Sequence, residues 1–362
     1  MVLKVHSSPR ARAEAFIDRL GLRLPIVLAP MAGACPPSLS IAVANAGGLG
    51  ACGALMMAPD DIRSWSTEFR KGSQEEFQIN LWIPDAVPPV RDFESEKRQR
   101  EFLAGWGPAV PPEAGNTVLP NFDEQCQAIL DIAPKAVSSI MGLYSPAFVR
   151  ELKARGIFWF ATVTTVAEAR AAAEAGADAV VAQSMEAGGH RGSFRAEDAE
   201  RHMVGAIALL PQIADAVNVP VIASGGIADA RGVAAALILG ASAVQIGTGF
   251  LRCPEAKMHP AYAERLARTE ADQTMITHAF SGRPGRSVAT EYVRAASMPG
   301  VPPPAPYPVQ RGLTRAMRES ALKSGDSERM QIWAGQGAKL AREQPAGALA
   351  RELWEAALRM LI

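Results

Sequence analysis

Short apolar runs alternate with segments of helical periodicity along most of the chain, and this alternation restricts the possible folds more than any other feature. Eight of the runs are predicted to be strands, and the apolar run 177–183 is typical of a buried parallel strand. They occupy residues 25–31, 49–55, 77–83, 136–142, 157–163, 177–183, 220–224 and 243–246. Helical segments separate them, and several of these end at a glycine. Eight such units without an intervening hairpin predict an α/β fold, a (β/α)8 TIM barrel.

Two stretches do not follow the alternation. Residues 84–120 have prolines at both ends around a charged run, which predicts a solvated insertion with one helix after the third strand. Residues 253–335 mix charged helical stretches with a proline-rich part, and 345–361 then shows the apolar spacing of the eighth barrel helix. We therefore predict a barrel domain made of 1–252 plus 336–362. Residues 253–335 are expected to form a mainly helical lid or substrate domain over the barrel mouth.

The composition excludes several classes of protein. The 362 residues carry 37 Lys and Arg against 37 Asp and Glu, and this balance gives no electrostatic footprint for nucleic acid or an anionic membrane. The four cysteines lie far apart without CxxC spacing, which argues against a metal site and against disulfides, and fits reduced thiols of a cytoplasmic protein. The first 20 residues lack the apolar core of a secretory signal, and no apolar run approaches the ~18 residues of a membrane span. A homo-oligomer is compatible with these features.

Glycines end the last two predicted strands, where a barrel of this kind often binds phosphate. Ser224-Gly225-Gly226 ends the seventh strand just before a helix, so that backbone N–H groups and the helix dipole converge on an anion. Gln245-Ile246-Gly247-Thr248 ends the eighth strand, where Gly247 permits close approach of a ligand and Thr248 offers a hydroxyl. Two such ends in this order predict a bound phosphate group.

Polar or small residues mark other strand ends. Asn80 interrupts the third strand and Gln183 ends the sixth, and buried amides cost free energy unless they are paired. Two interpretations stand: these amides face a polar ring system lying across the barrel top, or they tie loops together. After the first strand, Met31-Ala32-Gly33 offers a small and soft surface for a flat ring.

The sixth strand opens into a glycine-rich loop, Ser184-Met185-Glu186-Ala187-Gly188-Gly189-His190-Arg191-Gly192. Its glycines allow a ligand to approach the backbone closely. A solvated histidine in an ordinary turn is the alternative, but the strand order places His190 at the barrel mouth beside the predicted phosphate site. We expect the neighbouring Arg191 to be solvated, with anion binding as the alternative. The other histidines are interpreted as surface or packing residues, with His278 also a candidate to line the pocket: His6, His202, His259 and His278.

Taken together, these motifs resemble the nitronate monooxygenases, formerly called 2-nitropropane dioxygenases. The resemblance covers residues 24–252 and is carried by Ala29-Pro30-Met31-Ala32-Gly33, Asn80, Gln183, Glu186 to Gly192, Ala223-Ser224-Gly225-Gly226-Ile227 and Gln245 to Thr248. It returns at Trp333-Ala334-Gly335-Gln336. Flavin-dependent enoyl-acyl-carrier-protein reductases and NADH:quinone reductases look similar. One departure lies at 280–286, which reads Phe-Ser-Gly-Arg-Pro-Gly-Arg where the best-characterised members carry a Gly-Arg-Tyr-Ala-Arg-like run.

The resemblance implies an FMN-dependent enzyme that oxidises alkyl nitronates or nitroalkanes with O₂ to a carbonyl compound and nitrite. It implies that His190 is catalytic, as the base for the acidic carbon or, when protonated, as the group that positions a nitronate. The candidate FMN contacts are Ala29, Met31, Ala32, Asn80, Gln183, Gly188, Gly189, Ser224, Gly225, Gly226, Gln245, Ile246, Gly247 and Thr248. Two other interpretations stand beside this one. They are an NAD(P)H-dependent FMN reductase acting on enoyl thioesters or quinones, and a phosphate-ligand-binding barrel without flavin.

Overall fold

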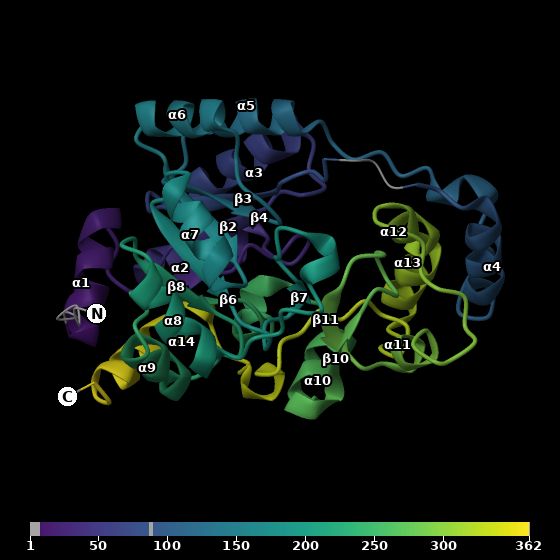
Figure 1. Cartoon of the computed structure of the whole chain (residues 1–362). Helices are drawn as coiled ribbons and strands as arrows, with labels where there is room; N and C mark the ends of the chain where they lie inside the picture. The colour runs from purple at the N-terminus through teal and green to yellow at the C-terminus, as the bar shows by residue number, and fades with distance from the viewer. Residues whose placement is uncertain (1–7, 87–89, 362) are drawn as a thin grey trace.

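The computed structural model describes residues 8–86 and 90–361, and its centre is a barrel of eight parallel strands (Figure 1). The strands are β1 (Ile26–Leu28), β2 (Gly50–Gly53), β3 (Phe77–Trp82), β4 (Ala136–Ile140), β5 (Phe158–Val163), β6 (Ala179–Gln183), β8 (Val221–Ser224) and β9 (Ala243–Ile246). Their order around the sheet is β1-β9-β8-β6-β5-β4-β3-β2. Each lies within one of the predicted apolar runs, so the predicted (β/α)8 barrel is confirmed.

β1 and β2 close the barrel through a short parallel bridge. Val27 pairs with Leu49, the residue just before β2. The Leu28 N–H donates to the Leu49 carbonyl at 2.9 Å, and the Leu49 N–H donates to the Ile26 carbonyl at 3.0 Å. Because all eight strands are parallel, their carboxyl ends meet at one mouth. Every second side chain points into the interior.

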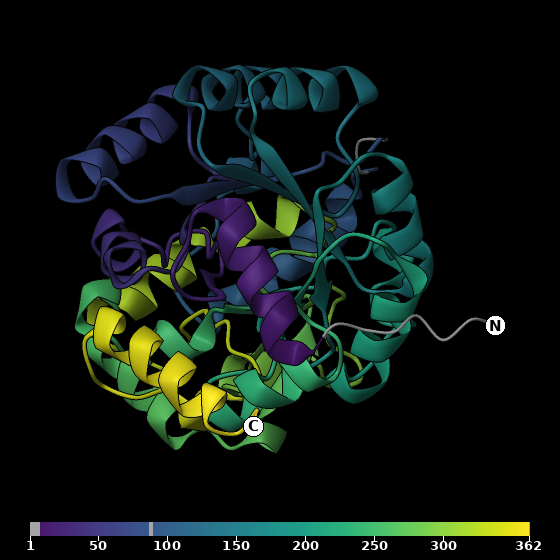
Figure 2. The same cartoon turned by 90° about the vertical axis from the view of Figure 1, so that its left-hand side faces the viewer.

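The opposite mouth is filled by α1 (Pro9–Leu20), which lies across the end of the barrel (Figure 2, purple). Phe16 and Leu20 of this helix are buried against side chains that point into the barrel. These interior side chains include Val27, Leu49, Phe160, Val181 and Ile222. The lower half of the interior is therefore a packed apolar core, and the space for a ligand lies at the carboxyl-terminal mouth.

The helices around the barrel follow the predicted order. They are α2 (Pro37–Ala46), α3 (Pro59–Gly72), α5 (Phe122–Ile132), α6 (Pro146–Ala154), α7 (Val166–Glu174), α8 (Ala206–Ala216), α9 (Ala230–Ile238) and α14 (Ala346–Leu358). Local signals start these helices: the Ser145 hydroxyl caps α6 by accepting from the Phe148 N–H at 3.2 Å, with Pro146 at the first helical position. α14 is the expected closing helix and packs against both α2 and α9.

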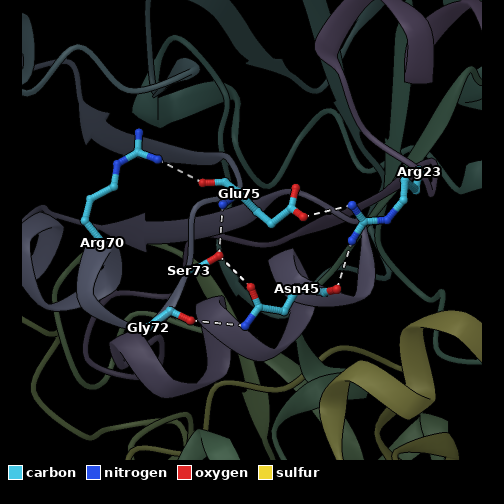
Figure 3. Close-up of polar contacts among 6 residues, drawn as sticks. All are labelled: Arg23, Asn45, Arg70, Gly72, Ser73 and Glu75. Atoms are coloured by element: carbon cyan, nitrogen blue, oxygen red, sulfur yellow. Dashed lines mark hydrogen bonds and ion pairs between the residues drawn. The ribbon is translucent and has the colours of Figure 1, made fainter.

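Polar contacts fasten the loops that lead into the first strands (Figure 3). The Arg23 guanidinium donates to the Glu75 carboxylate at 2.8 Å and to the Asn45 carbonyl at 2.9 Å. The Asn45 amide donates to the Gly72 carbonyl at 3.2 Å and accepts from the Ser73 hydroxyl at 2.6 Å. Because exposed ion pairs contribute only about 0–1 kcal/mol, we infer that these contacts mainly set the loop geometry.

A second group of elements, here called the side lobe, lies at the end of the barrel opposite α1 (Figure 1). It contains α4 (Phe93–Ala104), α10 (Pro260–Arg268), β10 (Thr274–Thr277), β11 (Gly285–Val288), α11 (Glu291–Ala295), α12 (Val309–Leu313) and α13 (Arg315–Ser324). The α-helix predicted in the 84–120 insertion is α4, but the prediction that it is solvated is wrong. Leu103 of α4 is fully buried in a cluster with Phe280, Tyr292 and Val309. The many charged residues of this stretch made burial look improbable from the sequence. One of them, Glu96, is nevertheless buried, because it forms an ion pair with Arg91.

The side lobe also contains an antiparallel sheet that the sequence analysis did not predict. Its order is β10-β11-β7, where β7 is only Gly189–His190. Gly285 lies opposite His190 and Arg286 opposite Gly189. The glycine-rich loop therefore leaves a barrel strand and pairs with the side lobe.

The remaining sequence expectations concern residues near the start of the chain and in the insertion, the four cysteines, and membrane-spanning helices. His6 and residues 87–89 of the predicted insertion lie outside the described residues. Cys35, Cys52, Cys126 and Cys253 are all buried and unpaired. Within the described ranges, we find no helix with the length and apolar character needed to cross a lipid bilayer.

Candidate functional site

A cavity of about 860 Å³ opens at the carboxyl ends of the barrel strands. Its wall includes these predicted residues: Ala29, Met31, Ala32, Asn80, Gln183, Gly188, Gly189, His190, Ser224, Gly225, Gly226, Gln245, Gly247 and Thr248. Barrel closure brings these distant segments together. The side lobe adds Arg311 and Arg318, and Trp333 from the segment before α14 completes this part of the wall.

Ile246 is the one predicted site residue that lies away from this wall. Its side chain is buried in the core between the barrel and the helices, since it alternates along β9 with the inward-facing Gln245. The Gln245 side-chain oxygen accepts from the Gln78 amide at 3.3 Å, and the same amide donates to the Leu28 carbonyl at 3.1 Å. Gln78 is fully buried, and its role inside the barrel was not predicted.

The loop after β8 has the shape of an anion-binding nest. Gly225 and Gly226 have φ angles of 111° and 72°, which side-chain-bearing residues rarely adopt. Within the described part of the chain, the N–H groups of Gly225, Gly226 and Ile227 meet no protein acceptor. Across the cavity wall, the Thr248 hydroxyl accepts from the Gly335 N–H at 3.0 Å. All three residues line the cavity, so we interpret their N–H groups as donors to a ligand.

Both predicted amides line the cavity and are also hydrogen-bonded to the protein. The Asn80 amide donates to the Ser138 carbonyl at 3.2 Å and to its hydroxyl at 3.0 Å. The Gln183 amide donates to the His190 carbonyl at 3.0 Å, and its oxygen accepts from the Gly192 N–H at 2.8 Å. Gln183 therefore ties the glycine-rich loop to the end of β6.

The segment around Trp333–Gln336 lies directly against the glycine-rich loop. The Gln336 N–H donates to the Glu186 carbonyl at 2.9 Å. A Cβ atom on Gly188 would come within 2.4 Å of the Gly335 backbone nitrogen, so only glycine allows this approach. The two stretches are distant in sequence but form one structural unit.

His190 lies in this wall between two tryptophan rings. Its ring centroid is 4.7 Å from that of Trp82 and 4.8 Å from that of Trp333. Its Nε2 atom is 2.8 Å from the Ser281 Oγ. Burial, and then the charge of Arg311, lowers the pKa of His190 to about 3. The imidazole is therefore neutral at physiological pH.

Comparisons with known proteins agree with this site. A sequence model of the nitronate monooxygenase family matches residues 14–356. The chain belongs to this family. It is 40% identical over 346 residues to the nitronate monooxygenase of Pseudomonas aeruginosa, which covers 94% of this chain and 98% of the relative. A probable nitronate monooxygenase of Bacillus subtilis is 36% identical, with 91% and 94% covered.

Solved structures of related proteins have the same architecture. A nitroalkane oxidase from Streptomyces ansochromogenes matches with a TM-score of 0.85 and 35% identity, covering 95% of this chain and 98% of that one. FabK from Thermotoga maritima matches with a TM-score of 0.71 and 29% identity, covering 96% of each. The nitronate monooxygenase resemblance is thus confirmed, and the chain is an oxidising enzyme. In residues 8–86 and 90–361, no group of three or more His, Cys, Asp or Glu side chains could hold a metal ion.

Arg191 of this nitronate monooxygenase family member is not solvated, which corrects the prediction. Its side chain is only 1% exposed, and Nη1 donates to the Ser184 carbonyl at 2.7 Å and to the Gln183 side-chain oxygen at 3.2 Å. Burial lowers the pKa of Arg191 to about 10, so the guanidinium stays charged at neutral pH. The usual exposure of arginine fails here because the Arg191 N–H bonds to the Pro284 carbonyl, which places the residue between barrel and side lobe.

Three side chains near His190 were missing from the predicted set. Trp82 follows Asn80 by two residues on β3, so the strand period of two could have placed both on one face. Ser281 lies in the stretch that departs from the best-characterised family members. Arg311 carries no local signal, because the packing of the side lobe brings it to the cavity.

The other described histidines, His202, His259 and His278, lie at the surface, in the outer cavity or in an ion pair. His202 is exposed. His259 lines the outer cavity and caps α10 by accepting from the Ala261 N–H at 3.2 Å. His278 pairs with Glu200 at 3.1 Å and is not part of the cavity wall.

Replacing Arg191 with alanine tests its role in holding the loop. The change removes the donor to the Ser184 carbonyl inside the protein, so we expect the free energy of unfolding to fall by about 1–3 kcal/mol. Urea denaturation measures this. The control is Arg195→Ala, whose side chain is 70% exposed and for which we expect a loss of less than about 1 kcal/mol. Equal, small losses in both variants would contradict the structural role of Arg191.

Proposed function

We propose that this chain is an FMN-dependent enzyme that oxidises alkyl nitronates, or the nitroalkanes that yield them, with O₂ to a carbonyl compound and nitrite. The observation that carries the proposal is the neutral, half-buried His190 in the wall of a cavity whose other wall is a glycine-rich anion nest. Membership of the nitronate monooxygenase family and the likeness to a nitroalkane oxidase support the same chemistry.

The residues of the cavity fit FMN. The free N–H groups of Gly225, Gly226 and Ile227, together with Gly247 and Thr248, would hold the phosphate. For the flavin ring, Met31 and Ala32 provide an apolar surface on one side of the wall. Asn80 and Gln183 provide polar groups on another side. When bound, FMN supplies the two-electron oxidation and the reaction with O₂.

Ser281 determines which nitrogen of His190 can act as a base. The Ser281 hydroxyl donates to the Arg283 carbonyl at 3.2 Å, so its oxygen is left to accept a hydrogen bond. At 2.8 Å, the partner is then the protonated Nε2 of His190. This leaves Nδ1 unprotonated, and no described residue bonds to it. In the proposed reaction, Nδ1 takes the proton from the carbon next to the nitro group.

The surroundings of His190 favour the base role over the positioning role. A protonated imidazole would be needed to attract a nitronate, but burial and the nearby charges of Arg311 and Arg283 hold the ring neutral. Trp82 and Trp333 flank the ring and reduce its contact with water. A low pKa makes His190 a weak base in the free enzyme, so the geometry of the bound substrate must supply part of the driving force.

His190→Asn tests the base. The amide keeps polarity and approximate shape but cannot take a proton, so we expect the variant to keep FMN and to lose about 10²–10⁴-fold in kcat with an unionised nitroalkane. Steady-state oxygen consumption measures kcat, and His202→Asn, at an exposed position, is the control. Between pH 5 and 8 we expect no fall of the wild-type rate from His190, because it becomes protonated only near its lowered pKa of about 3. Near wild-type turnover in His190→Asn would exclude the base assignment.

Gly226→Val tests the phosphate site. A side chain at φ 72° strains the loop, at a cost of about 1–3 kcal/mol, and its Cβ would lie 3.2 Å from the Glu186 Cβ. We expect lower FMN occupancy, measured by visible absorbance of the purified protein. Gly156→Val is the matched control, since Gly156 also has positive φ, 66°, but a Cβ atom there would meet nothing within 4 Å, and Gly156 does not line the cavity. Full FMN occupancy in Gly226→Val would place the phosphate elsewhere.

The NAD(P)H-dependent reductase is the second candidate, favoured by the structural likeness to FabK. Anaerobic mixing of the FMN-loaded protein separates the two. We expect a nitronate to bleach the flavin absorbance, and NADH or NADPH to leave it unchanged on the same timescale. Rapid bleaching by NADH or NADPH, with no response to a nitronate, would favour the reductase.

A further inference from the structure

Two arginines of the side lobe line the cavity that contains His190, and they differ in how their guanidinium groups are bonded. Arg318 is fully engaged. Its Nε donates to the Thr314 hydroxyl at 3.2 Å, its Nη1 to the Gln331 side-chain oxygen at 3.3 Å, and its Nη2 to the Arg311 carbonyl at 2.9 Å. The Arg311 guanidinium, by contrast, makes no hydrogen bond or ion pair with any described residue.

The other arginines near His190 also have protein partners. Arg283 makes a two-pronged contact with the Asp85 carboxylate at 2.9 and 2.8 Å. Arg286 donates to the Met185 carbonyl at 3.0 Å, and Arg191 holds the glycine-rich loop. Arg311 is therefore the arginine in this part of the described structure whose side-chain donors all remain available to a ligand.

A second unused donor lies close to Arg311. The Tyr307 hydroxyl is buried and has no hydrogen-bond partner in the described structure. The Tyr307 ring centroid is 5.4 Å from that of Trp82, whose ring in turn contacts His190. Arg311 acts electrostatically on both neighbours, lowering the pKa of His190 and opposing the rise in the pKa of Tyr307 that burial causes. Arg311 thus lies near both His190 and Tyr307, and of these two Arg311 neighbours only His190 is part of the cavity wall.

We propose that Arg311 binds an oxyanion of the substrate beside His190. This inference rests on the proposed function and names the residue that selects anionic substrates. The Arg311 side chain is half-buried in the cavity wall with its donors unused, and a planar two-oxygen anion matches these paired donors. Because His190 is neutral, it cannot supply the positive charge that a nitronate requires. The oxyanion has two possible sources: the nitronate group itself, or a carboxylate elsewhere on the same substrate.

Arg311→Gln in the FMN-loaded enzyme tests the proposal. Loss of a charge-assisted contact should weaken binding of nitrate, a planar oxyanion that cannot react, by about 10- to 100-fold in calorimetry. KM for an alkyl nitronate should rise by a similar factor, while kcat/KM for the neutral nitroalkane should change far less. Arg311→Lys should retain part of the affinity. The pKa of His190 should rise in Arg311→Gln, because a nearby positive charge is lost.

Arg315→Gln is the matched control. It removes the same charge from an exposed position at the start of α13 that is not part of the cavity wall, and we expect changes within about twofold. A rise of KM confined to nitronates that also carry a carboxylate, with weaker binding of acetate instead of nitrate, would identify the carboxylate as the bound group.

Two results would overturn the proposal. One is unchanged affinity of Arg311→Gln for both nitrate and acetate; the other is a loss of FMN affinity alone, which would make Arg311 a cofactor residue. Failure of the proposed function looks different. In that case the wild-type enzyme would turn over no nitronate, yet its binding of nitrate or acetate would still depend on Arg311.

Discussion

Closure of the barrel between β1 and β2 is the constraint on which the rest of the structure depends. Two backbone hydrogen bonds at Leu49 complete the ring, and the closed ring brings all eight carboxyl ends to one mouth. Closure also fixes which side chains face inward. The lower layers are filled by apolar residues and by α1, while Gln78 and Gln245 pair higher in the interior. The ligand cavity is the remaining space above them.

The site is shared between the barrel and the side lobe, and this division explains its electrostatics. The barrel contributes glycine-rich strand ends with free N–H groups, and the side lobe contributes arginines. The glycine-rich loop joins the two parts, because β7 pairs with β11 while Gln183 and Arg191 hold the loop to the end of β6. His190 thereby lies half-buried next to positive charge, and burial first, then this charge, lowers its pKa. The proposed neutral base and the proposed anion-binding arginine are two consequences of one arrangement.

Much of the fold and part of the site could be predicted. Hydrophobic runs located the eight strands, and glycine or proline at helix ends located most of the surrounding helices, because these signals act over a few neighbouring residues. Strand order then placed Gly188, Gly226 and Gly247 at a common mouth, as the cavity wall shows. The usual solvent exposure of arginine and of charged segments predicted burial less well. Arg191 and one face of α4 were expected to be solvated and are buried, because other parts of the chain cover them.

The sequence by itself determined the barrel, the glycine-lined mouth and the position of His190, since each depends on local periodicity and on the order of the strands. Only the tertiary structure decided the state of His190 and its partners. Ser281 and Arg311 reach it from segments that are distant along the chain, and Ser281 Oγ lies 2.8 Å from its Nε2 atom. Burial then sets the pKa of the ring. Desolvation and long-range charge depend on what surrounds a residue in space, and no local pattern encodes that.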